Sequence, residues 1–100
     1  MMKIILAALL LLAMMPFSAN AQTPQTADDY IQAAFDLADA GKYDDAMINY
    51  QRAIDASAVG SCDRGHAEAG LTAAKAAKEG ETFLDVLTRE SGKLPGECLI

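Results

Sequence analysis

The stretch GKYDDAMINYQRAI, residues 41–54, begins with a glycine and then places apolar side chains at helical spacing. These side chains fall on one stripe, while the charged residues fall on the opposite face, a pattern typical of an amphipathic helix. The stripe consists of Tyr43, Ala46, Met47, Tyr50, Ala53 and Ile54. Because an exposed stripe of this length is costly in water, it predicts a second element that packs against it.

The preceding segment, residues 27–40, supplies that element. Its apolar positions follow spacings of three and four and form a stripe with an adjoining flank: Tyr30, Ala34 and Leu37, then Ile31, Phe35 and Ala38. Thr26 is a good N-cap, and Gly41 is a residue that ends helices in the left-handed conformation. Since only two or three residues connect the two predicted helices, we expect them to lie antiparallel and adjacent.

Together the two segments resemble one tetratricopeptide repeat (TPR) that covers residues 27 to about 58. The resemblance rests on Tyr30, Ala34, Leu37, Gly41, Tyr43, Ala46, Tyr50 and Ala53. It implies a helical hairpin of the kind that stacks into a right-handed α-solenoid. Ala58 departs from the family, which usually has a helix-ending proline there, so we expect the second helix to exit through residues 59–61.

The rest of the chain predicts a second, less regular hairpin. Residues 62–79 are rich in alanine and are followed by Gly80, and residues 81–91 are amphipathic through Phe83 and Val86. The step from Gly41 to Gly80 exceeds the ~34 residues usual for the family, so the second repeat is degenerate. Residues 92–100 form a turn-rich tail. The expected fold is all-α, with two antiparallel TPR-like helical hairpins over residues 27–100.

The first residues have the features of a secretory signal peptide: Lys3, an apolar run from Ile4 to Met15, and small residues after it. That run is shorter than the ~20 residues of a membrane-spanning helix. Ala19 and Ala21 provide the small-x-small pattern that signal peptidase requires, which predicts residues 1–21 as the signal and a mature chain starting at Gln22. Residues 22–26 are expected to be a flexible lead-in. The mature protein is expected in the periplasm or outside the cell, without stable membrane insertion.

The net charge limits the class of partner, and the cysteine content indicates the compartment. The chain has 14 acidic and 8 basic residues, so loss of Lys3 leaves a net charge of about −7, which disfavours nucleic acid. Cys62 and Cys98 are the two cysteines, and in an exported chain such a pair predicts a disulfide. An intermolecular disulfide and a metal site are the alternatives. A bridge from 62 to 98 would stabilise the fold by about 4 kcal/mol through loop closure.

The residues give little support to catalysis or to cofactor binding. His66, Cys62 and Asp63 could share a helix face, but a tetrahedral metal site would also require Cys98 as a thiolate. The adjacent acids at 28–29 and 44–45 point about 100 degrees apart on a helix and fit first-turn or solvated positions better than a shared proton site. We therefore expect no enzyme activity, no metal and no cofactor.

The resemblance also implies a ligand groove on the first helix. TPR grooves usually use the flank that here comprises Asp28, Ile31, Phe35, Ala38 and Asp39. Alternatively, the third predicted helix folds across Ile31 and Phe35 and makes them part of the core. Since about three repeats are normally needed for a stable stack, so short a chain needs help from a disulfide, from self-association or from a partner.

The sequence thus predicts an exported TPR-like module that binds a protein or peptide of unknown identity. The alternative is a structural subunit of the cell envelope that self-associates and has no dedicated ligand groove.

Overall fold

The computed structural model describes residues 25–99, and within them every regular element is helical. The elements are α1 (Ala27–Asp39), α2 (Tyr43–Ala56), α3 (Cys62–Lys78), α4 (Phe83–Ser91) and a final 3-10 helix, η3 (Gly96–Cys98). The all-α expectation is therefore confirmed. The predicted signal peptide, with Ala19 and Ala21, and most of the lead-in lie outside the described residues.

Local sequence explains where the first hairpin begins and turns. Thr26 caps α1 as predicted: its Oγ1 accepts from the Asp29 backbone N–H at 3.2 Å, and the Asp29 carboxylate accepts from the Thr26 N–H at 3.1 Å. At the other end Gly41 has a φ of 81°, and the next residue, Lys42, donates its N–H to Leu37 O at 2.8 Å. This is the glycine-terminated helix end that the sequence predicts.

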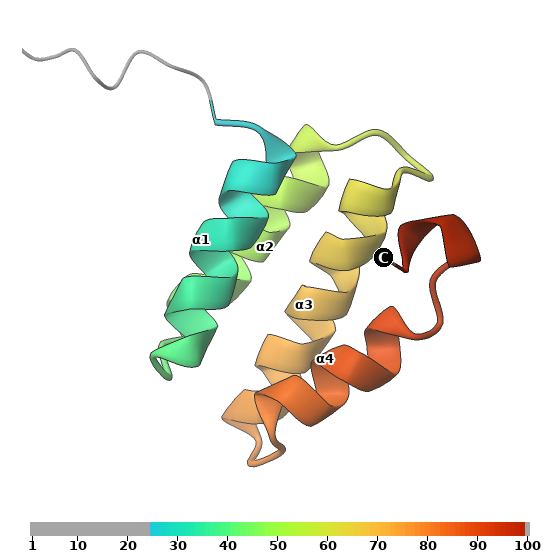
Figure 1. Cartoon of the computed structure of the whole chain (residues 1–100). Coiled ribbons are helices and arrows are strands. Elements are labelled where there is room, and N and C mark those ends of the chain that lie inside the picture. Colours follow the sequence, from blue (N-terminus) through green and yellow to red (C-terminus); the bar gives the residue numbers. More distant parts are fainter. Residues whose placement is uncertain (1–24, 100) are drawn as a thin grey trace, which may run out of the picture.

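The second hairpin turns in the same way. Gly80 has a φ of 103°, and Glu81 donates its N–H to Ala76 O at 3.1 Å. A side chain at either glycine position would be strained, because L residues rarely adopt positive φ. The two turns therefore fix two helical hairpins, α1 with α2 and α3 with α4 (Figure 1).

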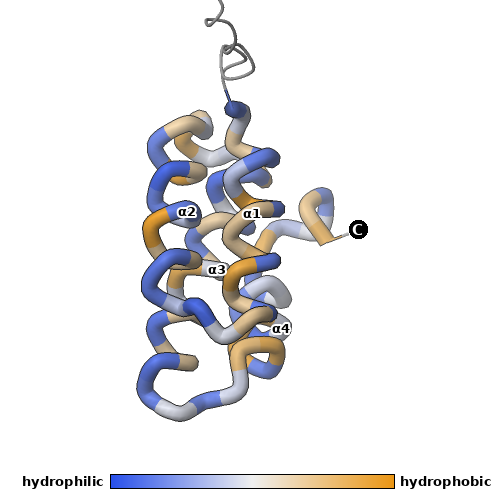
Figure 2. Tube along the Cα trace, turned by 90° about the vertical axis from the view of Figure 1, so that its left-hand side faces the viewer, coloured by the Kyte–Doolittle hydropathy of each residue, from blue (hydrophilic) through white to orange (hydrophobic). Residues whose placement is uncertain are grey.

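α3 is the central helix, since it packs against α2, α4 and α1. Simple repetition of the first hairpin would place α4 beside α2. Instead, α4 packs mainly against α3, and in Figure 2 it lies on the side of α3 where α1 lies. At the first residue of α4, the Phe83 ring lies 6.0 Å from that of Phe35 and 6.4 Å from that of Tyr43, measured between centroids. The second hairpin is therefore not a spatial copy of the first.

The core is built from alanines around two large side chains. Tyr50 and Val86 are each 1% exposed, and the helices approach closely because small residues surround them: Ala34, Ala46, Ala53, Ala67, Ala73 and Ala74 are all fully buried. One such close approach is at Gly70 of α3. A Cβ there would lie 2.2 Å from Cε1 of Tyr50, so only glycine fits beneath the ring without a shift.

Two further contacts hold α3 in place. Arg64 donates from Nη2 to the carbonyl oxygens of Ile54 at 3.0 Å and Ser57 at 3.3 Å, and so caps the C-terminus of α2 with a positive charge. The second contact is the predicted disulfide between Cys62 and Cys98, whose Cα atoms are 5.3 Å apart and which closes a loop of 36 residues. A disulfide is compatible with an oxidising, exported location.

Candidate functional site

The residues that carry the TPR resemblance lie along the interface of the first hairpin and at its turn. Ala34, Ala46, Tyr50 and Ala53 are buried, and Tyr30, Leu37 and Tyr43 are partly buried against the two core clusters. Gly41 occupies the turn. The structure thus brings the α1 and α2 stripes together, while membership of the family stays a prediction.

The five residues of the predicted groove on α1 do not form one open surface. Asp28 and Asp39 are exposed, whereas Ala38 is 3% exposed and belongs to the core. Ile31 and Phe35 are half-buried and pack against that core. This contact with the core was the alternative that the sequence left open, and at Phe35 the fourth helix also takes part, through the ring of Phe83. A ligand role for the set stays a prediction.

An open apolar surface occurs instead between α2 and α3. A hollow of about 420 Å³ is lined by Asp44, Met47, Ile48, Gln51, Leu71 and Lys75. Ile48 is 50% exposed, although it lies on the face of α2 that carries the charged residues. Asp44 forms an ion pair with Lys78 of α3 beside this hollow. The surface therefore combines an apolar floor with a charged rim, which is the composition of many peptide-binding sites.

Sequence analysis did not identify this hollow. One signal was present, since Ile48 interrupts an otherwise polar face of the predicted helix. The contribution of Leu71 gave no comparable signal, because it depends on how α3 is rotated against α2.

The chemistry considered at Cys62, Cys98 and His66 is limited by the disulfide. The sulfur atoms of Cys62 and Cys98 are bonded to each other, so neither cysteine is a thiolate ligand or a nucleophile in this state. Within residues 25–99 no group of three or more His, Cys, Asp or Glu side chains is placed to hold a metal ion. Burial raises the pKa of Tyr50 to about 12, and this side chain lies in the core rather than in a hollow.

Among residues 25–99 no helix has both the length and the apolar composition needed to cross a bilayer. Comparisons with protein-family models, with curated proteins and with solved structures gave no match.

Proposed function

We propose that this chain is an exported, TPR-like interaction module that binds a protein or peptide partner. One observation carries the proposal: Ile48 is half exposed over a hollow whose floor includes Met47 and Leu71, and no residue of α1 or α4 lines it. An apolar side chain held at an open hollow gives a partner a place to bury an anchor residue of its own.

Charge supports a partner that carries basic residues beside its apolar anchor. The chain is acidic overall, whereas the exposed charges close to Ile48 are of both signs, with Asp44 and Asp45 on α2 beside Arg52 of α2 and Lys75 of α3. The net charge of the whole chain therefore attracts a basic segment and repels an acidic one, which affects the rate of association more than its final strength.

The α1 flank with Ile31 and Phe35 is a weaker candidate surface. Its apolar side chains already have partners in the core, so a ligand there would compete with contacts that hold α4. We therefore assign binding to the α2–α3 hollow, defined as the six residues that line it.

The experiment is capture of crosslinked partners by tagged mature chain in its own cell envelope, compared between two variants. Ile48→Gln changes the hollow, and Val59→Gln changes an 86% exposed apolar residue that does not line it. Both should melt like the wild type, since exposed substitutions have small effects on stability. We expect Ile48→Gln to lose the captured partner and Val59→Gln to retain it. Equal capture by both variants would contradict the assignment.

Self-association is the alternative use of the same exposed side chains. Light scattering over a range of concentrations distinguishes it: a mass that stays monomeric removes the alternative. If the mass instead rises with concentration and Ile48→Gln abolishes the rise, the hollow binds a second copy.

A further inference from the structure

The C-terminal segment 93–99 runs back over α3 and belongs to neither of the two core clusters, although its Cys98 is buried. The two buried clusters and the residues packed against them end at Leu87. Every hydrogen bond that the structure gives residues 93–99 is local. Lys93 and Leu94 donate to Glu90 and Ser91 at the end of α4, and the N–H groups of Cys98 and Leu99 donate to the carbonyl oxygens of Pro95 and Gly96. The segment is joined to α3 by the Cys62–Cys98 disulfide, and the Leu94 side chain packs over Gly65.

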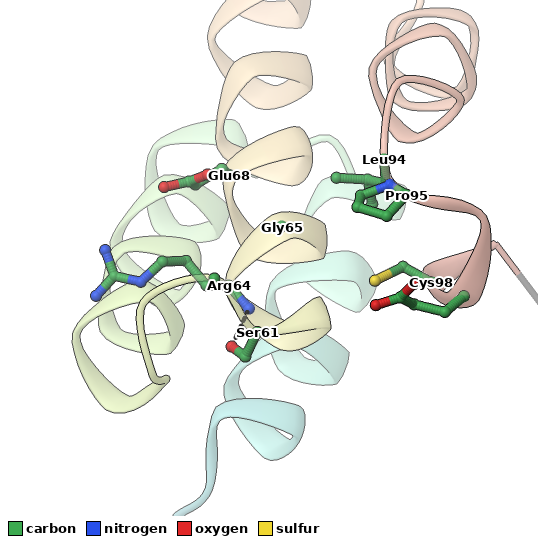
Figure 3. A pocket seen from close by; sticks show the side chains of 9 residues that line it. Ser61, Arg64, Gly65, Glu68, Leu94, Pro95 and Cys98 are labelled. Atoms are coloured by element: carbon green, nitrogen blue, oxygen red, sulfur yellow. Dashed lines mark hydrogen bonds between the residues drawn. The ribbon is translucent and has the colours of Figure 1, made fainter.

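Two hollows flank this segment, and Cys98 lines both of them. One, of about 210 Å³, lies between the segment and the start of α3 and includes Ser61, Gly65 and Leu94 (Figure 3). The other, of about 400 Å³, includes His66, Leu87 and Leu99 on the side of α4. In Figure 3, Leu94 and Pro95 face Gly65, whereas Arg64 points away from the segment, toward α2. The segment therefore forms a wall of both hollows.

We propose that the Cys62–Cys98 disulfide is a redox-operated clasp that holds residues 93–99 over α3, and that its reduction frees this segment while the four helices stay folded. The reductant is a dithiol. Its thiolate attacks Sγ of Cys62, which is half-buried while Cys98 is 7% exposed, and Cys98 leaves as a thiolate. The second thiol of the reductant then displaces Cys62. Two electrons and two protons pass to the pair, and the reductant becomes its own disulfide.

Survival of the helices depends on their own packing. Reduction removes the loop-closure stabilisation of the disulfide, so the proposal requires that the contacts among the helices alone keep the chain folded. Neither Cys62 nor Cys98 belongs to the core cluster that contains Tyr50. The rings of Phe35, Tyr43 and Phe83 pack against one another without a residue of the segment. The segment itself loses its covalent bond to α3 and keeps only noncovalent packing there, which includes the contact of Leu94 with Gly65.

The test is amide hydrogen exchange on folded, oxidised mature protein before and after addition of dithiothreitol, at a temperature well below the thermal midpoint. We expect the amides of Cys98 and Leu99 to lose protection by about tenfold or more, because their hydrogen bonds are local and would fray. Peptides from α2 and from the middle of α3 should remain protected, with a uniform decrease that reflects the lost loop-closure stabilisation, and the far-UV circular dichroism should keep its helical signal. The Cys62→Ser/Cys98→Ser variant without reductant should reproduce the reduced pattern.

Two results would overturn the proposal. Loss of protection in all four helices together with the segment would mean that the disulfide maintains the whole fold. Unchanged protection in residues 93–99 after complete reduction, verified by mass, would mean that packing alone holds the segment.

Discussion

Gly70→Ala is the substitution for which two physical effects have opposite signs. Alanine is the better helix former, by about 1 kcal/mol in a helix interior. At this position, however, the new Cβ would lie 2.2 Å from Cε1 and 2.3 Å from Cζ of Tyr50. Normal contacts begin near 3.4 Å, so the ring or one of the helices must move by about 1 Å. Tyr50 is 1% exposed, so neighbouring atoms enclose its ring.

The free-energy cost of the clash with Tyr50 should therefore exceed the gain in helix propensity. Overpacking of a close-packed core costs about 1 to 3 kcal/mol, and a clash with a buried ring belongs at the upper end of that range. Subtracting the gain in propensity, we expect Gly70→Ala to lower the free energy of unfolding by about 2 kcal/mol. For a domain of this size the thermal midpoint would fall by about 8 to 16 °C. Urea denaturation of the oxidised chain, followed by far-UV circular dichroism, measures the difference.

Gly65→Ala in the same helix is the matched control. Its Cβ would approach Leu94 Cδ2 at 2.8 Å, but that atom is the far end of a flexible side chain that can rotate away. We expect a variant as stable as the wild type or up to about 1 kcal/mol more stable. In a Tyr50→Leu background, Gly70→Ala should also cost less than in the wild type, since the ring is gone. Equal stability of the two glycine variants would refute the close packing of α2 on α3.

Three other substitutions test separate parts of the structure. Cys62→Ser/Cys98→Ser should lower the thermal midpoint by about 15 to 30 °C, from a loop-closure effect of about 4 kcal/mol; a shift of only a few degrees would mean that packing suffices. Phe35→Ala should lower the free energy of unfolding by about 2 to 3 kcal/mol, less than for a fully buried ring, and a wild-type melting curve would place that ring in a groove. Burial raises the pKa of Tyr50 from 10.0 to about 12, so the folded state favours the neutral phenol. The stability that this provides is complete below pH 10 and is lost as the pH rises to about 12. Denaturation curves measured at each pH should show this loss in the wild type and not in Tyr50→Phe, which has no group that titrates at this position.

The helices were predictable because several local signals agree along the chain. Thr26 caps α1, and Gly41 and Gly80 end α1 and α3 with positive φ. The spacing of apolar residues between these points specifies helices, and the short connections specify hairpins. The cysteine pair predicted the disulfide from compartment and count.

The placement of the second hairpin was not predictable in the same way. Whether α4 packs on the side of α1 or of α2 depends on which neighbours Phe83 meets, and contacts between residues so distant in sequence leave no periodic signal. The same limit applies to the predicted groove, where α4 covers Phe35, and to Arg64, whose partners are the last carbonyls of α2. Gly70 did carry a signal, since a glycine inside an alanine-rich helix suggests a close approach by another element.

Site-specific photocrosslinking tests most directly whether the α2–α3 hollow is the binding surface. A photoreactive residue is placed in turn at position 48 in the hollow, at position 39 on the exposed edge of the α1 flank, and at position 59 in the loop after α2. Irradiation of cells that export each variant should yield a partner adduct when the photoreactive residue replaces Ile48 and none when it replaces Val59. An adduct from Asp39 without one from Ile48 would contradict the assignment and place the ligand on α1.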